Sequence, residues 1–464
     1  MDVPRILIAG VRGGSGKTLI SLGLLAAWRT LGRQVVPFKK GPDYIDAAWL
    51  TRAAGQPCRN LDLFLMSPEV VTSSFSGSAS GADVAVIEGN RGLFDGMDAR
   101  GSYSTAELAK LLQTPVVLSV DCTKATRTVA AVVLGCQQLD TRVPLRGVIL
   151  NQVAGPRHES VLREAIAGIC NIPVLGAIPR IRERFFPERH LGLVPPEEHG
   201  QLESAIEQAM AVAERHLALH AIWDLAREAP PLEAQPKPGP TPGTEPHAAV
   251  ARIVVLRDAA FQFYYPENLE ALETHGAQLI RVSPISDAAL PEVDALYIGG
   301  GFPETLAPLL SENKPFLGSL RRNIERGLPV YAECGGTVYL GEKLLFEGNE
   351  YPMVAALPAV FAFGVKPQGH GYTAVETVAP NPFYPVGQNL RGHEFHYTYL
   401  QSSAEGLDFA FRVQRGHGFD GQHDGLCHRN LLASYTHVHA LGTPGWAPAL
   451  VRAATRFRGA SRPA

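Results

Sequence analysis

The stretch Gly10-Val11-Arg12-Gly13-Gly14-Ser15-Gly16-Lys17-Thr18 decides the fold of the N-terminal half of the chain. It follows an apolar run at 5–9, which predicts a buried strand, and precedes an apolar run at 19–28, which predicts a helix. A strand, a glycine-rich turn and Lys-Thr at a helix start are the context of a phosphate-binding loop. An ordinary glycine-rich turn is the alternative, but such a turn needs no Lys-Thr pair. The candidate phosphate contacts are Gly13, Gly14, Ser15, Gly16, Lys17 and Thr18.

The chemistry of this loop points to ATP and Mg²⁺. Backbone N–H groups and the helix N-terminus attract phosphate oxygens, Lys17 would reach the β- and γ-phosphates, and the Thr18 hydroxyl would ligate Mg²⁺. The first glycine is Gly10, one residue earlier than in the standard Gly-x4-Gly-Lys-Thr spacing. This shift resembles the dethiobiotin-synthetase-like and ParA/MinD-like branch of P-loop proteins, which favours ATP over GTP. Arg12 stands where the ParA/MinD branch carries a lysine.

The overall composition of the chain limits the kinds of partner that we expect. The net charge of −3, from 42 basic and 45 acidic residues, gives no overall field for nucleic acid or an anionic membrane. The N-terminus shows no signal peptide, and the longest apolar runs, at 129–136 and 353–363, are too short to span a bilayer. Six scattered cysteines without a CxxC pair suggest neither a disulfide framework nor a zinc site. We therefore expect a cytoplasmic protein without nucleic-acid or membrane partners.

Two α/β patterns organise the 464 residues. Apolar strands alternate with amphipathic stretches up to about residue 225, which predicts βαβ units with a parallel sheet. The Pro-rich stretch 229–248 predicts a linker. A second α/β pattern begins near 250 and turns into mixed β after about 350. The predicted domains are 1–228, 229–248 as linker, and 249–464. The predicted strands are 6–9, 35–38, 84–88, 116–120, 148–150, 174–177, 252–256, 278–282, 295–298 and 329–332.

Acidic residues follow two predicted strands of the first domain. Asp43 and Asp46 come after the second strand, Glu88 ends the third and Asp95 follows it. Open α/β sheets place their sites beyond the carboxyl ends of strands, and oxygen ligands suit Mg²⁺. The alternative for any one of them is a helix cap. Asn151, at the end of a later strand, is the candidate contact to adenine, although asparagine is also common in turns.

A cysteine at a strand-to-helix turn marks the second domain. Cys334 lies in Glu333-Cys334-Gly335-Gly336, after an apolar strand and before a helical stretch. This is the arrangement of a nucleophile elbow, in which the helix N-terminus is expected to lower the thiol pKa. The N–H of Gly335 would serve an oxyanion. Gly300 and Gly301, at another strand end, would supply the other half of the oxyanion hole.

A nucleophilic cysteine needs a base, and His437 is the candidate. His439 stands two residues on and points to the same side if the segment is extended. The cluster Arg391-Gly392-His393-Glu394-Phe395-His396-Tyr397 has the chemistry of a metal site, but a substrate-cleft or structural role is favoured. The remaining cysteines are taken as structural.

Taken together, the motifs resemble the cobyrinic acid a,c-diamide synthase family along nearly the whole chain. In that family an N-terminal dethiobiotin-synthetase-like ATPase domain is joined to a C-terminal class I-like glutamine amidotransferase domain. The motifs are Gly-x5-Gly-Lys-Thr (10–18), Gly-Pro-Asp-Tyr-Ile-Asp (41–46), Glu-Gly-x-x-Gly-Leu-Phe-Asp-Gly (88–96), Ser-Thr-Ala-Glu-Leu-Ala (104–109), His-Leu-Gly-Leu-Val-Pro (190–195), Glu-Cys-Gly-Gly (333–336), Gly-His-Glu-Phe-His-Tyr (392–397) and Ser-Tyr-x-His-x-His (434–439).

The resemblance implies a carbon–nitrogen ligase. Cys334 would hydrolyse glutamine through a thioester, with His437 as base. ATP with Mg²⁺ would phosphorylate an acetate carboxylate of a sirohydrochlorin-derived tetrapyrrole, and ammonia would displace the phosphate. Asp43, Asp46 and Asp95 match the family's acidic residues around nucleotide and acyl phosphate, and Thr18, Asp46 and Glu88 are the implied metal ligands. The carboxylate that orients the histidine in other class I glutaminases has no counterpart next to His437.

Departures from the family pattern concern the acceptor. Arg12, Lys40, Tyr44 and Trp49 are the candidate substrate contacts, and the Lys39-Lys40 pair and Trp49 are unusual for the family. The acceptor is therefore cobyrinate or a related macrocycle, sirohaem or nickel-sirohydrochlorin. A different class of function is a ParA/MinD-like ATPase switch with an inactive glutaminase domain, which the intact Cys334 disfavours. A homodimer is compatible with the sequence, which does not set the oligomeric state.

Overall fold

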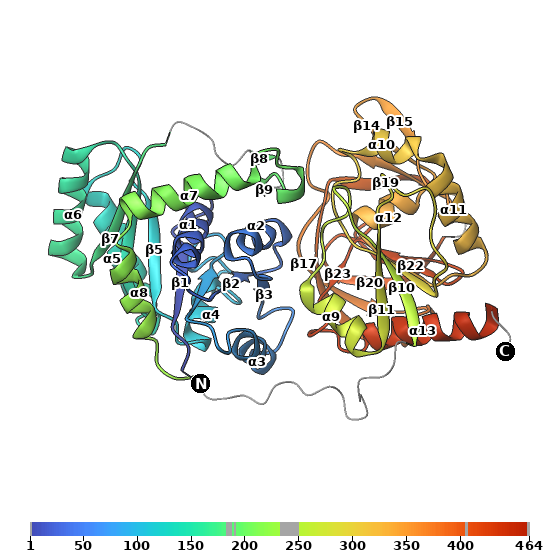
Figure 1. Ribbon diagram of the computed structural model, residues 1–464, viewed down its shortest axis with the longest axis horizontal. Helices are drawn as coiled ribbons and strands as arrows, with labels where there is room; N and C mark the ends of the chain where they lie inside the picture. The colour runs from blue at the N-terminus through green and yellow to red at the C-terminus, as the bar shows by residue number, and fades with distance from the viewer. Residues whose placement is uncertain (1, 182–187, 190–191, 233–249, 404–406, 462–464) are drawn as a thin grey trace. The chain divides into compact units, whose positions relative to one another are not determined.

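The computed structural model describes residues 2–181, 188–189, 192–232, 250–403 and 407–461, with no side-chain description for 188–192 and 461. The chain divides into two units, residues 1–238 and 239–464, which are described separately (Figure 1). Most of the predicted linker, from 233 onward, lies outside the described residues. The same holds for His190 and Leu191 of the motif at 190–195.

A parallel seven-stranded sheet forms the centre of the first unit, in the order β3-β2-β4-β1-β5-β6-β7. It contains every strand predicted for this half; β3 was not predicted because three residues of mixed polarity carry no pattern. The strands are β1 (Arg5–Gly10), β2 (Val35–Lys40), β3 (Arg59–Leu61), β4 (Val84–Glu88), β5 (Val116–Asp121), β6 (Leu145–Val153) and β7 (Val174–Pro179), with a short hairpin of β8 (Glu188–Arg189) and β9 (Gly192–Leu193).

Helices connect these strands and cover the sheet (Figure 1). α1 packs against both α7 and α2, and α5 packs against α6. The helices are α1 (Lys17–Thr30), α2 (Tyr44–Ala54), α3 (Pro68–Ser78), α4 (Thr105–Leu111), α5 (Arg127–Leu139), α6 (Pro156–Cys170), α7 (Leu202–His216) and α8 (Leu219–Arg227), with a 3₁₀ turn at Pro196–Glu198. The first unit is thus the α/β fold that the alternating pattern predicts.

The position of β1 places the phosphate loop at the centre of the carboxyl edge of this sheet. β1 pairs in parallel with β4 on one side, where Ile8 lies opposite Glu88, and with β5 on the other, where Gly10 lies opposite Ser119. The strands end together, so the residues that follow them meet at one edge. Glu88 therefore ends its strand beside the start of the loop.

The second unit is built on a ten-stranded mixed sheet, in the order β11-β10-β12-β13-β22-β21-β20-β17-β18-β23. β10 to β13 and β22 pair in parallel, and the remaining strands pair antiparallel. Its strands are β10 (Ala251–Leu256), β11 (Ala277–Val282), β12 (Ala295–Ile298), β13 (Val330–Glu333), β17 (Gly369–Thr377), β18 (Asn389–His396), β20 (Asp408–Arg415), β21 (His423–His428), β22 (Leu431–Ser434) and β23 (His437–Val438).

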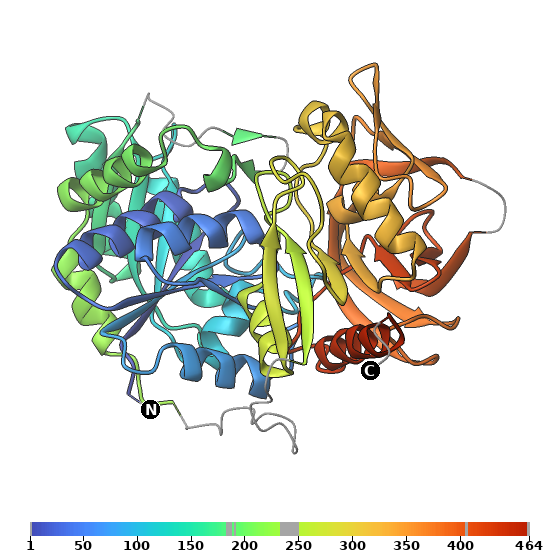
Figure 2. The same cartoon turned by 45° about the vertical axis from the view of Figure 1, so that its right-hand side comes forward.

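A smaller sheet and several helices complete this unit (Figures 1 and 2). The small sheet has the order β15-β14-β16-β19. α13 packs against α9, β10 and β12. The remaining elements are β14 (Lys343–Phe346), β15 (Asn349–Pro352), β16 (Ala359–Phe363), β19 (Thr398–Ser403), α9 (Pro266–Thr274), α10 (Ala307–Glu312), α11 (Lys314–Glu325), α12 (Gly335–Leu340) and α13 (Trp446–Ser461).

Alternation along the parallel strands divides the core of the second unit in two. Leu296 and Ile298 of β12 belong to one buried cluster, whereas Tyr297 between them belongs to the other, with Tyr331 and Trp446. Successive side chains of a strand point to opposite faces, so both faces of the sheet are covered. The strand ends that carry functional residues are therefore held from two sides.

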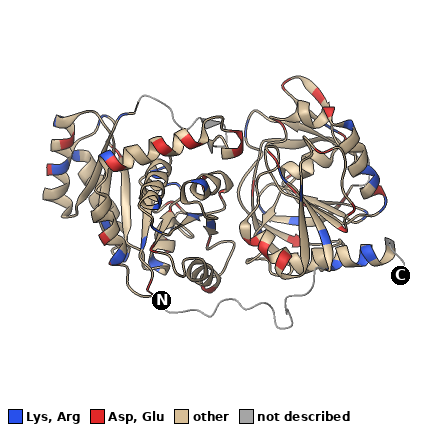
Figure 3. Cartoon of the chain, viewed as in Figure 1, with Lys and Arg blue, Asp and Glu red and all other residues tan. Residues whose placement is uncertain are grey.

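Charge and hydropathy can also be followed on the structure. Acidic and basic residues occur in both units (Figure 3). No helix among the described residues is long and apolar enough to cross a bilayer.

A close helix contact gives a test of this fold. A Cβ atom on Gly23 of α1 would lie 2.5 Å from the Ala209 carbonyl oxygen and 2.7 Å from the Ala213 methyl group of α7. Gly23→Ala is expected to lower the free energy of unfolding by about 1–3 kcal/mol, because α7 must shift. Gly168→Ala is the matched control: its Cβ would meet nothing within 4 Å, so it should be neutral or stabilise by up to about 1 kcal/mol. Urea unfolding of both variants checks this, and an equal effect would contradict the packing described.

Candidate active sites

Hydrogen bonds within the phosphate loop and from neighbouring strands hold its shape. The Ser15 carbonyl oxygen accepts from Ser119 Oγ at 2.6 Å and from Asn151 Nδ2 at 3.0 Å. The Ser15 hydroxyl bonds across the loop to the Arg12 carbonyl at 2.9 Å, and Lys17 Nζ donates to the same oxygen at 3.3 Å. The loop is thus folded before any phosphate binds.

Asn151, the residue predicted to contact adenine, contacts the phosphate loop in this structure. Its side chain is buried, its Nδ2 donates to Ser15 and its Oδ1 accepts the Gln152 N–H at 2.9 Å. A Cβ on Gly16 would lie 2.3 Å from Asn151 Nδ2, and Gly16 has a φ of 89°. These contacts favour a role in supporting the loop over one in reading the base.

A buried charge network joins the loop to the strand ends. Glu88 Oε1 accepts from the Thr18 hydroxyl and from Lys39 Nζ, both at 2.8 Å. Lys39 Nζ also donates to Asp46 Oδ2 at 2.5 Å. Lys39 and Glu88 are almost completely buried, and Asp46 is largely so. Three predicted residues, Thr18, Asp46 and Glu88, are therefore brought together around Lys39, which was expected near the acceptor and not among the metal ligands.

The charges in this network depend on one another. Burial would lower the pKa of Lys39, but Asp46 and Glu88 together raise it, so the ammonium form is secured. Burial raises the pKa of Glu88, because desolvation disfavours the carboxylate even beside a lysine. Burial lowers the pKa of Lys17, and the nearby charge of Lys39 lowers it further.

The residues present are suited to Mg²⁺. Glu88 Oε2 is buried without a hydrogen-bond partner, so one carboxylate oxygen of the network still lacks a ligand or a donor. The Thr18 hydroxyl lies on the other oxygen of the same carboxylate, and Asp46 is close through Lys39. A hydroxyl and carboxylates are the oxygen ligands that Mg²⁺ takes together with nucleotide phosphates.

The other two acidic residues have local backbone contacts. Asp43 caps α2, where its Oδ1 accepts the Asp46 N–H at 2.9 Å. Burial and the nearby Asp46 raise the pKa of Asp43 from 3.8 to about 7. Asp95 accepts the Gly92 N–H at 2.8 Å, which shapes the loop after β4.

The predicted acceptor residues differ in burial. The Trp49 indole is completely buried in α2 and donates to the Val194 carbonyl at 2.9 Å, so its contact with an acceptor stays a prediction that this burial does not support. Lys40 is also interior, 5% exposed and 3.8 Å from Asp62 Oδ2, and is likewise not at an open surface. Arg12 keeps a side chain 70% exposed while pairing with Asp121 at 2.7 Å, and Tyr44 is partly exposed.

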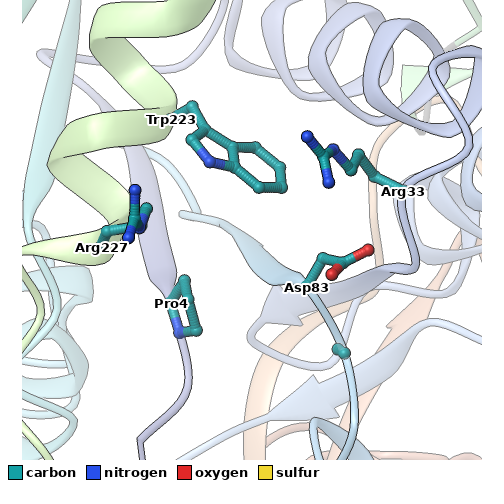
Figure 4. Close-up of a pocket in the computed structure, with 6 residues that line it drawn as sticks. Pro4, Arg33, Asp83, Trp223 and Arg227 are labelled. Carbon is teal, nitrogen blue, oxygen red and sulfur yellow. The ribbon is translucent and has the colours of Figure 1, made fainter.

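A second depression in the first unit lies away from this site (Figure 4). Four of its six lining residues lie just before β1, β2 or β4, at the amino edge of the sheet, and the other two belong to α8. The Arg33 guanidinium lies 5.1 Å from the centre of the Trp223 ring, and Asp83 accepts the Gln34 N–H at 2.8 Å. Packing accounts for these residues, and we assign them no part in phosphate chemistry. The lining residues are Pro4, Arg33, Ala82, Asp83, Trp223 and Arg227.

In the second unit, Cys334 occupies a strained turn between β13 and α12. Its φ of 48° and ψ of −105° are rare for a residue with a side chain and are typical of a nucleophile elbow. Its N–H donates to the Ser434 carbonyl at 2.7 Å, which ties the turn to the neighbouring β22. The expected elbow geometry is therefore present.

The expected fall in thiol pKa is wrong. Burial, followed by the charge of Glu304, raises the pKa of Cys334 instead. Only 6% of the residue is exposed, and α12 has a single turn and a half, so desolvation outweighs the helix end. Burial therefore works against the thiolate form at this position.

The glycine-rich loop at 299–303 approaches His437 and Gly335, the residue that follows Cys334. A Cβ on Gly300 would lie 2.6 Å from His437 Cε1. A Cβ on Gly335 would lie 3.1 Å from the Gly301 nitrogen. The oxyanion hole expected from Gly300, Gly301 and Gly335 stays a prediction.

The two histidines face different carboxylates. His437 Nδ1 lies 3.4 Å from Glu333 Oε2, whereas His439 Nε2 lies 3.7 Å from Glu267 Oε2. Both imidazoles are buried. Glu333, directly before the nucleophile, is a residue of the site that the sequence motifs did not reveal.

The cluster at 391–397 does not form a metal centre. His393 stacks on His437 with ring centres 4.8 Å apart, whereas Glu394 accepts the N–H groups of His417 and Gly418. Among the described residues no three His, Cys, Asp or Glu side chains are grouped to hold a metal ion. The favoured structural or cleft role of this cluster agrees with these contacts.

Comparison with known proteins defines the class of this chain. Residues 6–193 match the model of the CobQ/CobB/MinD/ParA nucleotide binding domain, and residues 252–444 match that of the CobB/CobQ-like glutamine amidotransferase domain. The chain is therefore an enzyme that joins a nucleotide-binding P-loop domain to a glutamine amidotransferase domain, and it uses ATP and glutamine.

Full-length relatives identify the family. The cobyrinate a,c-diamide synthase of Magnetococcus marinus is 46% identical over 456 residues, covering 97% of each chain. Those of Archaeoglobus fulgidus and Dehalococcoides mccartyi are 39% and 40% identical, covering 98% of this chain and 98% and 99% of theirs. The chain belongs to the cobyrinate a,c-diamide synthase family, which confirms the resemblance and the fold class inferred from its motifs.

The pKa of Asp43 leads to a pH-dependent test. A folded pKa of about 7 against an ordinary value of 3.8 means that the folded state holds a proton that the unfolded state releases, so stability falls between about pH 4 and pH 7. Asp43→Asn keeps a good helix cap and removes this cost. We expect the melting temperature of the variant, relative to wild type, to be higher at pH 8 than at pH 4. A difference that does not change between these pH values would contradict the assignment.

Proposed function

We propose that this enzyme uses ATP and glutamine to amidate peripheral acetate carboxylates of a sirohydrochlorin-derived tetrapyrrole, with cobyrinate as acceptor and its a and c acetates as targets. The observation that carries the proposal is the presence of two complementary sites on one chain. One joins a phosphate loop to the buried Glu88 network, and the other holds a strained cysteine and a buried histidine that lies beside Glu333, the residue before the cysteine. The names of the relatives supply the acceptor.

The second unit supplies nitrogen in this scheme. Cys334 Sγ attacks the carboxamide carbon of glutamine while its proton passes to His437. The proton then goes to the leaving nitrogen, so ammonia departs and a thioester remains. Water hydrolyses the thioester to glutamate and restores the thiol. The N–H groups of Gly301 and Gly335 would stabilise the oxyanion formed in each step.

The first unit activates the acceptor. A carboxylate oxygen of the tetrapyrrole attacks the γ-phosphorus of ATP, giving an acyl phosphate and ADP. Ammonia then attacks the acyl carbon and phosphate leaves, so one C–N bond replaces one C–O bond. Lys17 would bind the β- and γ-phosphates. Mg²⁺, held by Thr18, Glu88 and Asp46, would offset the negative charge of the phosphates.

Cobyrinate is favoured over sirohaem and nickel-sirohydrochlorin as acceptor. Sirohaem and nickel-sirohydrochlorin became candidates because the sequence departs from the family pattern, at Lys40 and Trp49 among other positions. Both side chains lie in the interior of the first unit. These two departures therefore affect the packing of the unit more than the choice of acceptor. Arg12 remains exposed, and a cation there suits a polycarboxylate.

An acceptor panel tests the proposal. Purified enzyme would be incubated with MgATP, a nitrogen source and cobyrinate, sirohaem or nickel-sirohydrochlorin, and the products weighed by mass spectrometry. We expect two carboxamides on cobyrinate with glutamine or with ammonium salt. Cys334→Ala should lose the reaction with glutamine and keep the reaction with ammonium, because only the nitrogen supply is broken.

Each of the other possible results would overturn a different part of the proposed function. Amidation of sirohaem or nickel-sirohydrochlorin alone would replace the acceptor and keep the chemistry. Absence of any amide product with either nitrogen source would reject the ligase proposal. In that case ATP hydrolysis alone would favour a ParA/MinD-like switch.

A further inference from the structure

The base of a cysteine or serine nucleophile works only when its imidazole is held in the right tautomer. A group at Nδ1 does this in hydrolase triads, where it also stabilises the imidazolium that forms. The sequence next to His437 supplies no such carboxylate. The question is which group in the second unit takes this position.

Glu333 lies where that group is needed. It is the last residue of β13 and is completely buried. Its Oε2 lies 3.4 Å from His437 Nδ1, longer than a good hydrogen bond. Catalytic hydrogen bonds are often long without substrate and tighten in the complex. A small movement of either side chain would close this contact.

Two other donors hold the Glu333 carboxylate in place. Its Oε1 accepts the Val438 N–H at 3.1 Å, directly next to His437 in the chain. Its Oε2 accepts the Tyr297 hydroxyl at 3.1 Å, and Tyr297 is itself bonded to Asn268. The carboxylate is thus anchored to the strand that carries His437 and to β12.

The imidazole of His437 is confined on its other sides. His393 stacks against it with an angle of 17° between the rings. Gly300 contacts its Cε1 so closely that a methyl group there would clash. The ring therefore has little freedom to turn away from Glu333.

We propose that Glu333 is the positioning residue of the glutaminase site, a third member supplied by the residue before the nucleophile. The proposal rests on the proposed role of Cys334 and His437 in glutamine hydrolysis. A carboxylate only accepts, so it keeps the proton on Nδ1 and leaves the Nε2 lone pair to take the thiol proton. It then stabilises the imidazolium until that proton passes to the departing ammonia.

The fold explains how adjacent residues fill both roles. Successive side chains of a strand point to opposite faces, which would separate Glu333 from Cys334. The positive φ of Cys334 ends the strand and turns the chain at this point. The carboxylate stays in the sheet beside β23 while the thiol moves out to the turn. The strained turn at Cys334 thus lets two adjacent residues take up different positions, one beside His437 and one at the start of α12.

Glu333→Gln tests the proposal. The amide keeps an oxygen for the Val438 N–H, but its NH₂ group facing Nδ1 favours the wrong tautomer. We expect kcat for glutamine hydrolysis to fall by about 10²- to 10⁴-fold, as expected for loss of an orienting carboxylate. KM for glutamine should stay within about threefold, because no ground-state contact is lost. Ammonium-driven amidation should be unchanged.

Two further variants separate positioning from packing. Glu333→Asp restores a carboxylate on a shorter side chain. Its kcat should be at least about tenfold higher than that of Glu333→Gln. Glu267→Gln makes the same chemical change beside His439, 3.7 Å away, and should leave kcat within about threefold of wild type. Thermal melting of each variant reports on its folding, and if the Gln variant does not fold, the Asp variant decides by its kcat relative to wild type.

The outcomes are distinct. A kcat of Glu333→Gln within about threefold of wild type would overturn the proposal, since orientation would then come from elsewhere. The proposal would also be overturned if a folded Glu333→Asp recovered none of the lost kcat and Glu267→Gln lost as much kcat as Glu333→Gln. If Cys334→Ala still hydrolyses glutamine, the proposed glutaminase function itself fails, which is a separate result.

Discussion

The buried carboxylate of Glu88 is the constraint on which the first unit depends. An ionised carboxylate in a protein interior costs several kcal/mol unless other groups compensate it. Here Lys39 and Thr18 share one of its oxygens, and Asp46 in turn holds Lys39. The phosphate loop, β2, β4 and the start of α2 are therefore linked by one charge network. The proposed nucleotide and Mg²⁺ would bind directly beside that network.

In the second unit, backbone strain at Cys334 holds the site together with buried charge. The Cys334 conformation costs about 1–3 kcal/mol and is held because both faces of the sheet are packed around it. The strain lets one strand end present a nucleophile and, one residue earlier, a carboxylate that faces His437. Both units thus follow the rule that sites form beyond the carboxyl ends of parallel strands, with different means of holding the chemistry there.

Sequence predicted what is local and missed what depends on side-chain direction. The loop at 10–18, Glu88, Cys334 and His437 stand in short motifs whose spacing carries the chemistry. Lys39 was noted only for its place near the acceptor, and Glu333 was not recognised, because their partners come from other strands and no spacing encodes a contact across a sheet. The burial of Trp49 was not foreseen, because closeness in sequence to a motif does not say which face of α2 a residue occupies. The thiol pKa was misjudged because burial depends on the whole unit.

The binding of ATP with and without Mg²⁺ tests the central claim most directly. Affinities would be measured by equilibrium titration for wild type and Glu88→Gln, in EDTA and in excess Mg²⁺. If Glu88 holds the metal at the phosphate loop, Mg²⁺ strengthens ATP binding to wild type, and the variant keeps its metal-free affinity but loses this gain. An equal gain from Mg²⁺ in both proteins would contradict the placement of the metal and the account of the network around Glu88.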